Sequence, residues 1–287
     1  MTDIVYLNGS LVPRDKAAVS VLDYGFLFGY GLFETMRAYQ GQVFLLDRHL
    51  SRLEAAAARL DIPVAAPELA KAVAAVIKAN GLSSARVRLA VSKGEGRLTP
   101  DPDSCKKATA LVMGEPYRPY PARIYRNGLR AVTASYRRNS QSPLSGLKTS
   151  NYLENILARR EAKKTGADEA LLLNEKGTLA EASMSNLFLA KDSILMTPDL
   201  SSGILPGITR GVVLELAAKL GIKAVETEIP PEAIFEADEA FLTNSLIEIM
   251  PLVEVDGKPI SDGKRGAVTA RLQKAYRALV RKSLKSR

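Results

Sequence analysis

A proline-rich segment near residue 118 strongly limits how this chain can fold. Pro116, Pro119 and Pro121 follow one another closely between two regions rich in apolar residues. Proline fixes φ and has no backbone amide, so this spacing predicts an extended connection between folded parts. The chain has 287 residues, 46% of them apolar, which is enough for two packed lobes. We therefore expect a small domain over 1–114, a linker over 115–125 and a larger domain over 126–287.

In the first domain, short apolar runs flank turn signals at residues 8–9 and 40–41 and predict two β-hairpins. Apolar residues then recur at helical spacing in two segments, the first capped by Asp47 and the second ending at Gly81. Hairpins mixed with helices are an α+β pattern. The expected elements are hairpins over 4–12 and 33–46, helices over 47–60 and 67–80, and strands over 86–91 and 108–113.

The second domain alternates strands and helices around a central lysine. Lys148 is expected to open an amphipathic helix that ends at Gly166. The other expected elements are strands over 129–135, 169–174, 179–182, 186–190 and 194–197, and a helix over 208–220.

The formal net charge of +9 raises the question of nucleic-acid binding. Much of the excess lies near the C-terminus, where Leu272, Tyr276 and Leu279 recur on one face of a predicted helix. The basic residues there then form its solvated side, and aromatic residues do not alternate with them. We expect no nucleic-acid partner, although a positive field would suit an anionic cofactor and acidic substrates.

The sequence gives little support to a metal site, a disulfide or a membrane-spanning segment. Cys105 is the only cysteine and His49 the only histidine, which excludes an internal disulfide and leaves too few ligands for a zinc site. The first residues carry charges, and no window approaches the ~18 apolar residues of a membrane span. We expect a cytoplasmic protein without a metal and without a membrane partner.

Two charged residues have the chemistry of a pyridoxal phosphate site. Lys148 lies in the run GLKTSNYLE, and Glu181 lies in the run LAEASMSNLF. A lysine amine can form a Schiff base with the cofactor's aldehyde, and a carboxylate can hold the pyridine nitrogen protonated. This pair therefore predicts such an enzyme.

The run from Leu205 to Arg210 predicts an anion site from helix physics alone. It opens a predicted helix, so the amides of Ile208 and Thr209 and the Thr209 hydroxyl present donors at the positive end of the dipole. A phosphate group fits such a site.

These motifs, together with the run DYGFLFGYGLFET over 23–35, resemble the class IV pyridoxal-phosphate aminotransferases. That family includes branched-chain aminotransferases, D-amino acid aminotransferases and 4-amino-4-deoxychorismate lyases. The likeness runs from about residue 4 to about residue 260. It implies an α+β, two-domain type IV fold, with a small N-terminal lobe and a larger lobe built on a barrel-like sheet flanked by helices. It also implies pyridoxal 5'-phosphate as the cofactor.

The resemblance assigns most cofactor contacts to single positions. Lys148 matches the Schiff-base lysine, which also moves a proton, and Glu181 matches the partner of the ring nitrogen. Tyr152, four residues after Lys148 and so on the same helical face, matches the phenol on the cofactor's 3-oxygen. Arg52 matches the phosphate arginine, with Arg48 as the local competitor. The remaining phosphate ligands are Ile208, Thr209 and Ser245, with an ordinary turn at Asn244-Ser245 as the alternative for the last.

Substrate contacts are assigned less sharply. Phe28, Tyr30 and Phe33 would supply apolar walls for an aliphatic side chain, and the amides of Leu246 and Ile247 would face the substrate carboxylate. Arg97 either binds a substrate carboxylate or is an exposed loop arginine. Thr99 stands where the D-amino acid branch has a histidine, which puts that branch's carboxylate trap in doubt.

Two reactions remain open on these residues. Phe33-Glu34 and the run 205–210 match branched-chain aminotransferases, which favours transfer of an amino group from a hydrophobic amino acid to a 2-oxo acid such as 2-oxoglutarate. The runs 136–140 and 243–245 read more like the lyase, which eliminates pyruvate to give 4-aminobenzoate for folate synthesis. A binding protein that has lost catalysis is disfavoured because Lys148, Glu181 and Arg52 occur together.

The resemblance also implies a homodimer with a shared active site. The loop from Tyr24 to Tyr30 would reach the partner's pocket, and its apolar Phe26, Leu27 and Phe28 suit an interface. Burial of this loop within its own lobe is the alternative.

Overall fold

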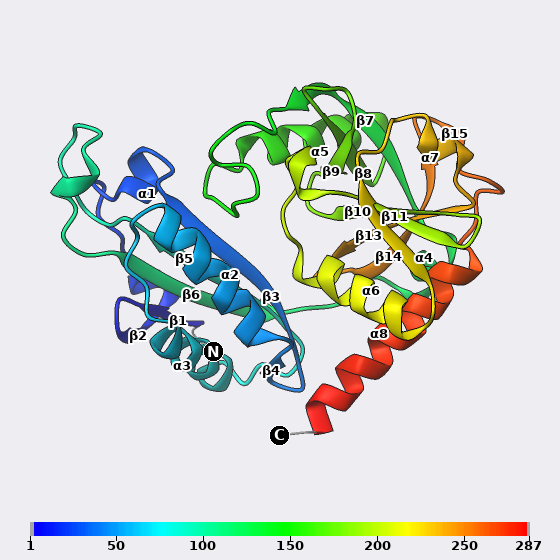
Figure 1. Cartoon of the computed structure of the whole chain (residues 1–287). Coiled ribbons are helices and arrows are strands. Elements are labelled where there is room, and N and C mark those ends of the chain that lie inside the picture. Colours follow the sequence, from blue (N-terminus) through cyan, green and yellow to red (C-terminus); the bar gives the residue numbers. More distant parts are fainter. Residues whose placement is uncertain (1–2, 286–287) are drawn as a thin grey trace. The chain divides into compact units, whose positions relative to one another are not determined.

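Two compact units make up residues 3–285, the part of the chain that the computed structural model describes (Figure 1). The first unit comprises the described residues up to Arg118 together with Leu147–Asn151. The second comprises Pro119–Gly146 and Tyr152–Lys285. The short segment that carries Lys148 therefore groups with the first unit, although the chain on both sides of it belongs to the second.

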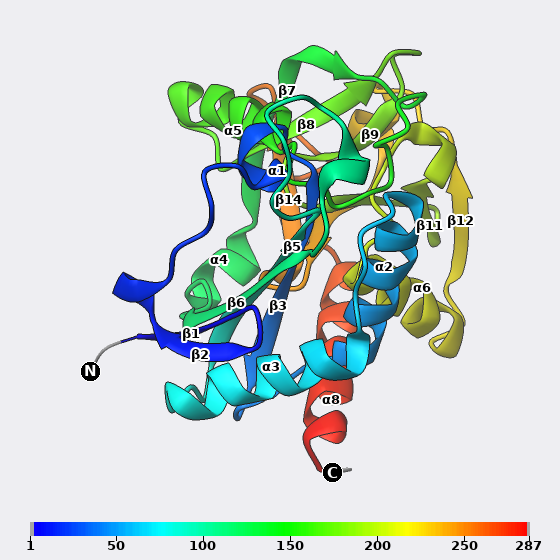
Figure 2. The same ribbon diagram turned by 90° about the vertical axis from the view of Figure 1, so that its left-hand side faces the viewer.

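The first unit is a six-stranded antiparallel sheet in the order β2-β1-β6-β5-β3-β4. Helices α2 and α3 lie along one face of it (Figures 1 and 2). The strands are β1 (Ile4–Leu7), β2 (Ser10–Pro13), β3 (Gly31–Tyr39), β4 (Gln42–Val43), β5 (Ala85–Ser92) and β6 (Thr109–Pro116). The helices are α1 (Tyr24–Leu27), α2 (Leu46–Arg59) and α3 (Ala66–Ala79), with 3-10 turns at Arg14–Lys16 and Pro102–Ser104.

Strand β3 sorts its side chains between the two faces of this sheet. Leu32 and Met36 are fully buried in the core, where α2 contributes Leu50 and Leu53 at helical spacing. Side chains alternate along a strand, so Glu34 points to the same helix-covered face as its neighbours Leu32 and Met36.

The first unit confirms both predicted hairpins and shifts one helix start. Asn8 and Gln40 adopt positive φ values of 48° and 50° at the two turns, a conformation that asparagine tolerates better than glutamine does. Helix α2 begins at Leu46, and Leu45 precedes it with φ of 54°. Asp47 was predicted as the N-cap and instead lies in the first turn, where a negative charge still favours the helix dipole.

The second unit is a nine-stranded mixed sheet in the order β12-β11-β10-β13-β14-β7-β8-β9, with β15 paired to β14. Strand β9 lies at the far end of this order from β10 and β11 and yet contacts both, so the sheet curls on itself as the predicted barrel-like sheet requires. The strands are β7 (Leu129–Arg138), β8 (Glu169–Asn174), β9 (Leu179–Ala182), β10 (Asn186–Lys191), β11 (Ile194–Pro198), β12 (Lys223–Thr227), β13 (Glu239–Asn244), β14 (Glu248–Val255) and β15 (Lys258–Pro259).

Helices pack around this curled sheet, and α5 runs beside β7 and β8 (Figure 2). The helices are α4 (Ala122–Asn127), α5 (Leu153–Thr165), α6 (Ile208–Lys219), α7 (Ala233–Glu236) and α8 (Ala267–Lys285), with a 3-10 turn at Leu200–Ser202. No helix within residues 3–285 is long and apolar enough to cross a membrane.

The segment around Lys148 is extended, and the predicted helix begins later. Helix α5 starts at Leu153, whereas Thr149 forms a bridge with Leu32 of β3. The Phe33 amide donates to the Lys148 carbonyl at 2.9 Å, and the Ser150 amide donates to the Gly31 carbonyl at 2.8 Å. The prediction that Lys148 and Tyr152 share a helical face was therefore wrong, because pairing with a distant strand outweighs the local helical pattern.

Candidate active site

Glu181 lies on β9 with its carboxylate held from several sides. Its Oε1 forms an ion pair with Arg138, while Oε2 accepts from the Leu205 amide at 3.0 Å and from the Asn186 side chain at 3.1 Å. The residue is buried, so the carboxylate would be costly without these partners. A carboxylate has about four lone-pair sites. The three observed donors leave capacity for one more.

Arg138 is a site residue that the sequence analysis did not single out. It ends strand β7, whose pairing with β8 shifts register between Thr133 and Arg137, and it also donates to the Gly203 carbonyl at 3.4 Å. Only 14% of its side chain is exposed. A basic residue at a strand end within the run 136–140 was the available signal, but its partner Glu181 is 43 residues away in sequence.

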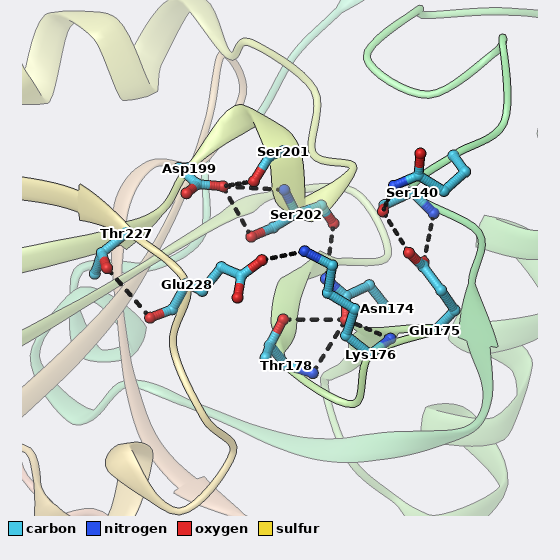
Figure 3. A network of polar contacts seen from close by, with 11 residues as sticks. Ser140, Asn174, Glu175, Lys176, Thr178, Asp199, Ser201, Ser202, Thr227 and Glu228 are labelled. Atoms are coloured by element: carbon cyan, nitrogen blue, oxygen red, sulfur yellow. Dashed lines mark hydrogen bonds and ion pairs between the residues drawn. The ribbon is translucent and has the colours of Figure 1, made fainter.

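A polar network fixes the loop that brings Leu205 to Glu181 (Figure 3). Asn174 at the end of β8 is fully buried and donates to the Ser202 carbonyl at 3.5 Å, which joins the β8–β9 turn to the loop before α6. Asp199 accepts from the Ser202 amide at 3.0 Å, which closes the turn within that loop. The loop that carries the Leu205 amide is therefore held by hydrogen bonds within the loop and by one to the end of β8.

Helix α6 begins where the sequence predicted an anion site. Gly207 is its N-cap, and Thr209 in its first turn is buried. The first amides of an α-helix have no partner within the helix and attract anions. A Cβ at Gly207 would lie 1.9 Å from Asn186 Oδ1, so a side chain there would displace Asn186 from its hydrogen bond with Glu181. Asn186 therefore touches both Glu181 and the start of this helix.

Tyr152 and the turn after β13 complete the predicted residues of the second unit. Tyr152 precedes α5, and its hydroxyl donates to the Ser183 carbonyl at 3.3 Å. Ser245 directly follows β13. The contact of the Leu246 and Ile247 amides with a substrate carboxylate stays a prediction. In the structure both amides donate to Asn244 Oδ1 at 2.9 Å. An asparagine side chain commonly closes its own turn in this way.

In the first unit, Lys148 and Phe33 come together. The Lys148 Nζ lies 4.5 Å from the centroid of the Phe33 ring, and Arg88 Cζ lies 3.8 Å from the same centroid. Arg88 was not predicted as a site residue. The available signal was the alternation of side chains along β5. Ala90 pairs with Phe33, and Arg88, two residues away, lies on the same face of the sheet.

Arg52 is bound by a buried carboxylate of the same unit. Its Nε donates to Glu34 Oε1 at 2.8 Å and its Nη2 to Oε2 at 2.6 Å, and His49 Nδ1 lies 2.7 Å from Oε2. Arg48, the competitor, is exposed, whereas only 14% of the Arg52 side chain is exposed. Burial by itself raises the pKa of Glu34, but the Arg52 charge and the hydrogen bonds with His49 and Arg52 outweigh it and lower the pKa to about 2.

This lowered pKa predicts how stability depends on pH. The folded-state pKa of Glu34 lies below the ordinary value, so its contribution of about 3 kcal/mol is present above pH ~5 and is lost as the pH falls toward 2. The free energy of unfolding of wild type and Glu34→Gln, measured by urea titration from pH 6 to pH 2.5, should differ most at pH 6 and converge in acid. A constant difference would contradict this linkage.

Three other predicted residues of the first unit contact residues of their own surroundings. Phe28 packs edge-on against Tyr24 with centroids 4.9 Å apart, and the Tyr30 hydroxyl donates to the Leu60 carbonyl at 2.9 Å. Arg97 is exposed in the loop between β5 and β6, and its amide donates to Ser104 Oγ at 3.0 Å. Within residues 3–285, no cluster of three or more His, Cys, Asp or Glu side chains could hold a metal ion.

Comparisons with known proteins identify the family of this chain. The family model described as amino-transferase class IV matches residues 31–255. A putative branched-chain-amino-acid aminotransferase of Methanocaldococcus jannaschii is 39% identical over 95% of each chain. An aminodeoxychorismate lyase of Bacillus subtilis is 34% identical over 96% of this chain and 94% of its own.

Solved structures show the same fold. The branched-chain amino acid aminotransferase of Escherichia coli superposes with a TM-score of 0.92 at 32% identity, over 97% of this chain and 95% of its own. A second branched-chain amino acid aminotransferase, named as that of T.th. and solved with pyridoxamine 5'-phosphate, superposes with a TM-score of 0.91 at 33% identity, over 96% and 93%. The predicted two-domain α+β fold is confirmed.

Proposed function

Because this chain belongs to the class IV amino-transferase family, we propose that it transfers the amino group of a hydrophobic, branched-chain-like amino acid to a 2-oxo acid such as 2-oxoglutarate. Pyridoxal 5'-phosphate is the proposed cofactor. The observation that carries this proposal is the carboxylate of Glu181, which three donors orient while it keeps capacity for one further hydrogen bond.

The residues present fit this cofactor. Lys148 supplies an amine for covalent attachment, Glu181 a carboxylate for the ring nitrogen, and the start of α6 an anion site for the phosphate, with Ile208 and Thr209 as donors. Arg52 and Ser245 are further proposed phosphate ligands, and Tyr152 the ligand of the ring oxygen. When bound, the cofactor withdraws electrons from the substrate's α-carbon, which makes the proton there removable.

Glu181 and Lys148 have separate tasks in this mechanism. Glu181, an anion kept in place by Arg138, would accept a hydrogen bond from the ring nitrogen and would favour the protonated ring. Lys148 would accept the proton that leaves the substrate's α-carbon and would return it later in the reaction. Its backbone is tied to β3 by the bonds of Phe33 and Ser150, so the side chain moves from a fixed base.

Substrate selection is proposed to rest on Phe33 and Arg88. A transaminase binds an aliphatic amino acid and an acidic 2-oxo acid in turn, and it needs both an apolar surface and a cation. Phe33 supplies an aromatic surface beside Lys148 Nζ, and the Arg88 guanidinium lies against the same ring. A guanidinium is well suited to bind the second carboxylate of a dicarboxylic acceptor.

Arg88→Leu should therefore separate the two substrates. We expect the KM for 2-oxoglutarate to rise about tenfold or more, because one charge-assisted contact is lost, while the KM for leucine changes less than about threefold. Steady-state kinetics with each substrate varied in turn measures this difference. Arg86→Leu, which removes an exposed arginine of the same strand, is the matched control and should leave both values unchanged. Equal effects on both substrates would contradict a role in acceptor binding.

The alternative function is 4-amino-4-deoxychorismate lyase, which the 34% identity to the Bacillus subtilis lyase keeps open. A half-reaction panel decides between the two. Purified protein loaded with the cofactor receives one amino acid at a time, and the visible absorbance band of the lysine-bound cofactor is followed. Loss of the band with leucine, isoleucine or valine supports the transaminase. No change with any amino acid, together with release of pyruvate and 4-aminobenzoate from aminodeoxychorismate, supports the lyase.

We also propose a homodimer. Phe26 is 76% exposed and Phe28 40% exposed in the loop that the family resemblance places at a subunit interface, whereas Tyr24 in the same loop is buried. Apolar side chains of this size favour contact with another surface. Sedimentation of wild type and Phe26→Ser tests the assignment, and only wild type should remain dimeric at low micromolar concentration.

A further inference from the structure

Glu34 is a charged residue at a core position of the first unit, where its neighbours on the same face are apolar. It lies between Leu32 and Met36 on the core face of β3, and its side chain is 1% exposed. Burial of a carboxylate is costly unless partners replace the lost water. The packing of α2 on β3 is already provided by apolar residues such as Leu50 and Leu53, so the charge needs a separate explanation.

Helix α2 supplies both partners of this carboxylate from neighbouring turns. Arg52 donates through Nε and Nη2 to the two different oxygens, which is the two-point geometry that fixes the plane of a guanidinium. His49 approaches Oε2 at 2.7 Å and is 2% exposed on its side chain. Because Oε2 is shared by both partners, rotation of the carboxylate would break contacts with each of them.

The guanidinium is thereby held by one defined edge. Glu34 binds the edge of the guanidinium formed by Nε and Nη2. The orientation of the guanidinium is thereby fixed, with Nη1 pointing away from Glu34. An arginine side chain otherwise has several rotatable bonds, and ordering it costs binding free energy. A preordered guanidinium binds a phosphate more tightly than a mobile one.

We propose that Glu34 and His49 are positioning residues, which fix the Arg52 guanidinium in the orientation that binds the phosphate of the cofactor. This inference rests on the proposed function, in which Arg52 is a phosphate ligand. It adds that Glu34 acts through Arg52, and that His49 acts through Glu34. The lowered pKa of Glu34 agrees with this arrangement, because a permanent anion is what holds the cation in place.

The test measures cofactor binding to the apoprotein rather than turnover. For Glu34→Gln, which keeps the shape of the side chain but removes its charge, we expect the dissociation constant for pyridoxal 5'-phosphate to rise about tenfold or more. The phosphorus-31 NMR signal of the bound phosphate should shift as well. Glu239→Gln is the matched control, since Glu239 is also a buried strand carboxylate and caps α8 by accepting from the amides of Val268 and Thr269. It should leave both readouts unchanged.

A double-mutant cycle separates positioning from a general effect on the fold. In the Arg52→Ala background, Glu34→Gln should no longer change the dissociation constant, because the residue that it positions is gone. If Glu34→Gln weakens binding equally in both backgrounds, the inference is overturned. If Arg52→Ala alone binds the cofactor like wild type, the proposed role of Arg52 fails instead, and if wild type does not bind the cofactor at all, the proposed function fails.

His49 provides a second test should Glu34→Gln fold poorly. His49→Asn keeps a nitrogen donor near the place of Nδ1, and His49→Leu removes it. We expect the dissociation constant to rise several-fold in His49→Leu and to return toward the wild-type value in His49→Asn. His49 is the only histidine of the chain, so its imidazole signals in a proton NMR spectrum can be assigned without mutagenesis. Equal affinities of the two variants would contradict the hydrogen-bonding role.

Discussion

Lys148→Ala is expected to lower turnover by about a thousandfold or more and to remove the visible absorbance of the lysine-bound cofactor. In the proposed mechanism the Lys148 amine both attaches the cofactor and carries the proton, and the variant loses it. Proton transfer by a placed side chain is commonly worth about 10²–10⁴ in rate. Turnover with leucine and 2-oxoglutarate and a spectrum of the purified protein measure both losses.

The fold should survive this change. The Phe33 amide bonds to the backbone carbonyl of residue 148, and the neighbouring bridge joins Thr149 to Leu32. These backbone contacts remain when the side chain and its contact with the Phe33 ring are removed, so the midpoint of thermal unfolding of the apoprotein should change little. Lys191→Ala, which removes a partly exposed lysine paired with Glu236, is the control and should keep full activity. Retained turnover in Lys148→Ala would refute the proposed mechanism.

Features that depend on a few adjacent residues could be predicted from the sequence. The hairpin turns followed from Asn8-Gly9 and Gln40-Gly41, where Gly9 and Gly41 take the positive φ values that glycine adopts readily. The start of α6 followed from Pro206 and Gly207, whereas the anion site at this helix start stays a prediction.

Features that depend on distant pairing could not be predicted in this way. The residues after Lys148 have a helical pattern, yet they pair with β3 in the first unit, more than a hundred residues earlier in the chain. Arg138 and Glu34 were overlooked as site residues for the same reason. A strand-end arginine and a strand glutamate look ordinary until the fold brings them to Glu181 and to Arg52.

The turn at Asn244 could be read from the sequence as an alternative to a ligand site. The Asn244 side chain accepts hydrogen bonds from the amides of Leu246 and Ile247. An asparagine side chain commonly closes its own turn in this way, and the contact of these amides with a substrate stays a prediction.

Glu181→Gln is expected to lower kcat by about 10²–10³-fold, while the cofactor remains attached to Lys148. The amide keeps the size of the side chain and can still accept a hydrogen bond, but it no longer offers the negative charge that favours a protonated ring. Turnover and the visible spectrum should therefore respond differently, the first strongly and the second modestly.

The variant also leaves Arg138 without its ionised partner. Because this guanidinium is 14% exposed, we expect the free energy of unfolding to fall by about 3 kcal/mol, so kinetics should be measured well below the unfolding midpoint.

Glu181→Asp separates charge from position in this assignment. It keeps the negative charge on a shorter side chain, whereas Glu181→Gln keeps the reach and removes the charge. If the charge on the ring nitrogen's partner is what catalysis needs, the aspartate variant should retain more activity than the glutamine variant. The reverse order would mean that catalysis depends on the position of the side chain at 181 rather than on its charge. That position is fixed by Arg138, Asn186 and the Leu205 amide.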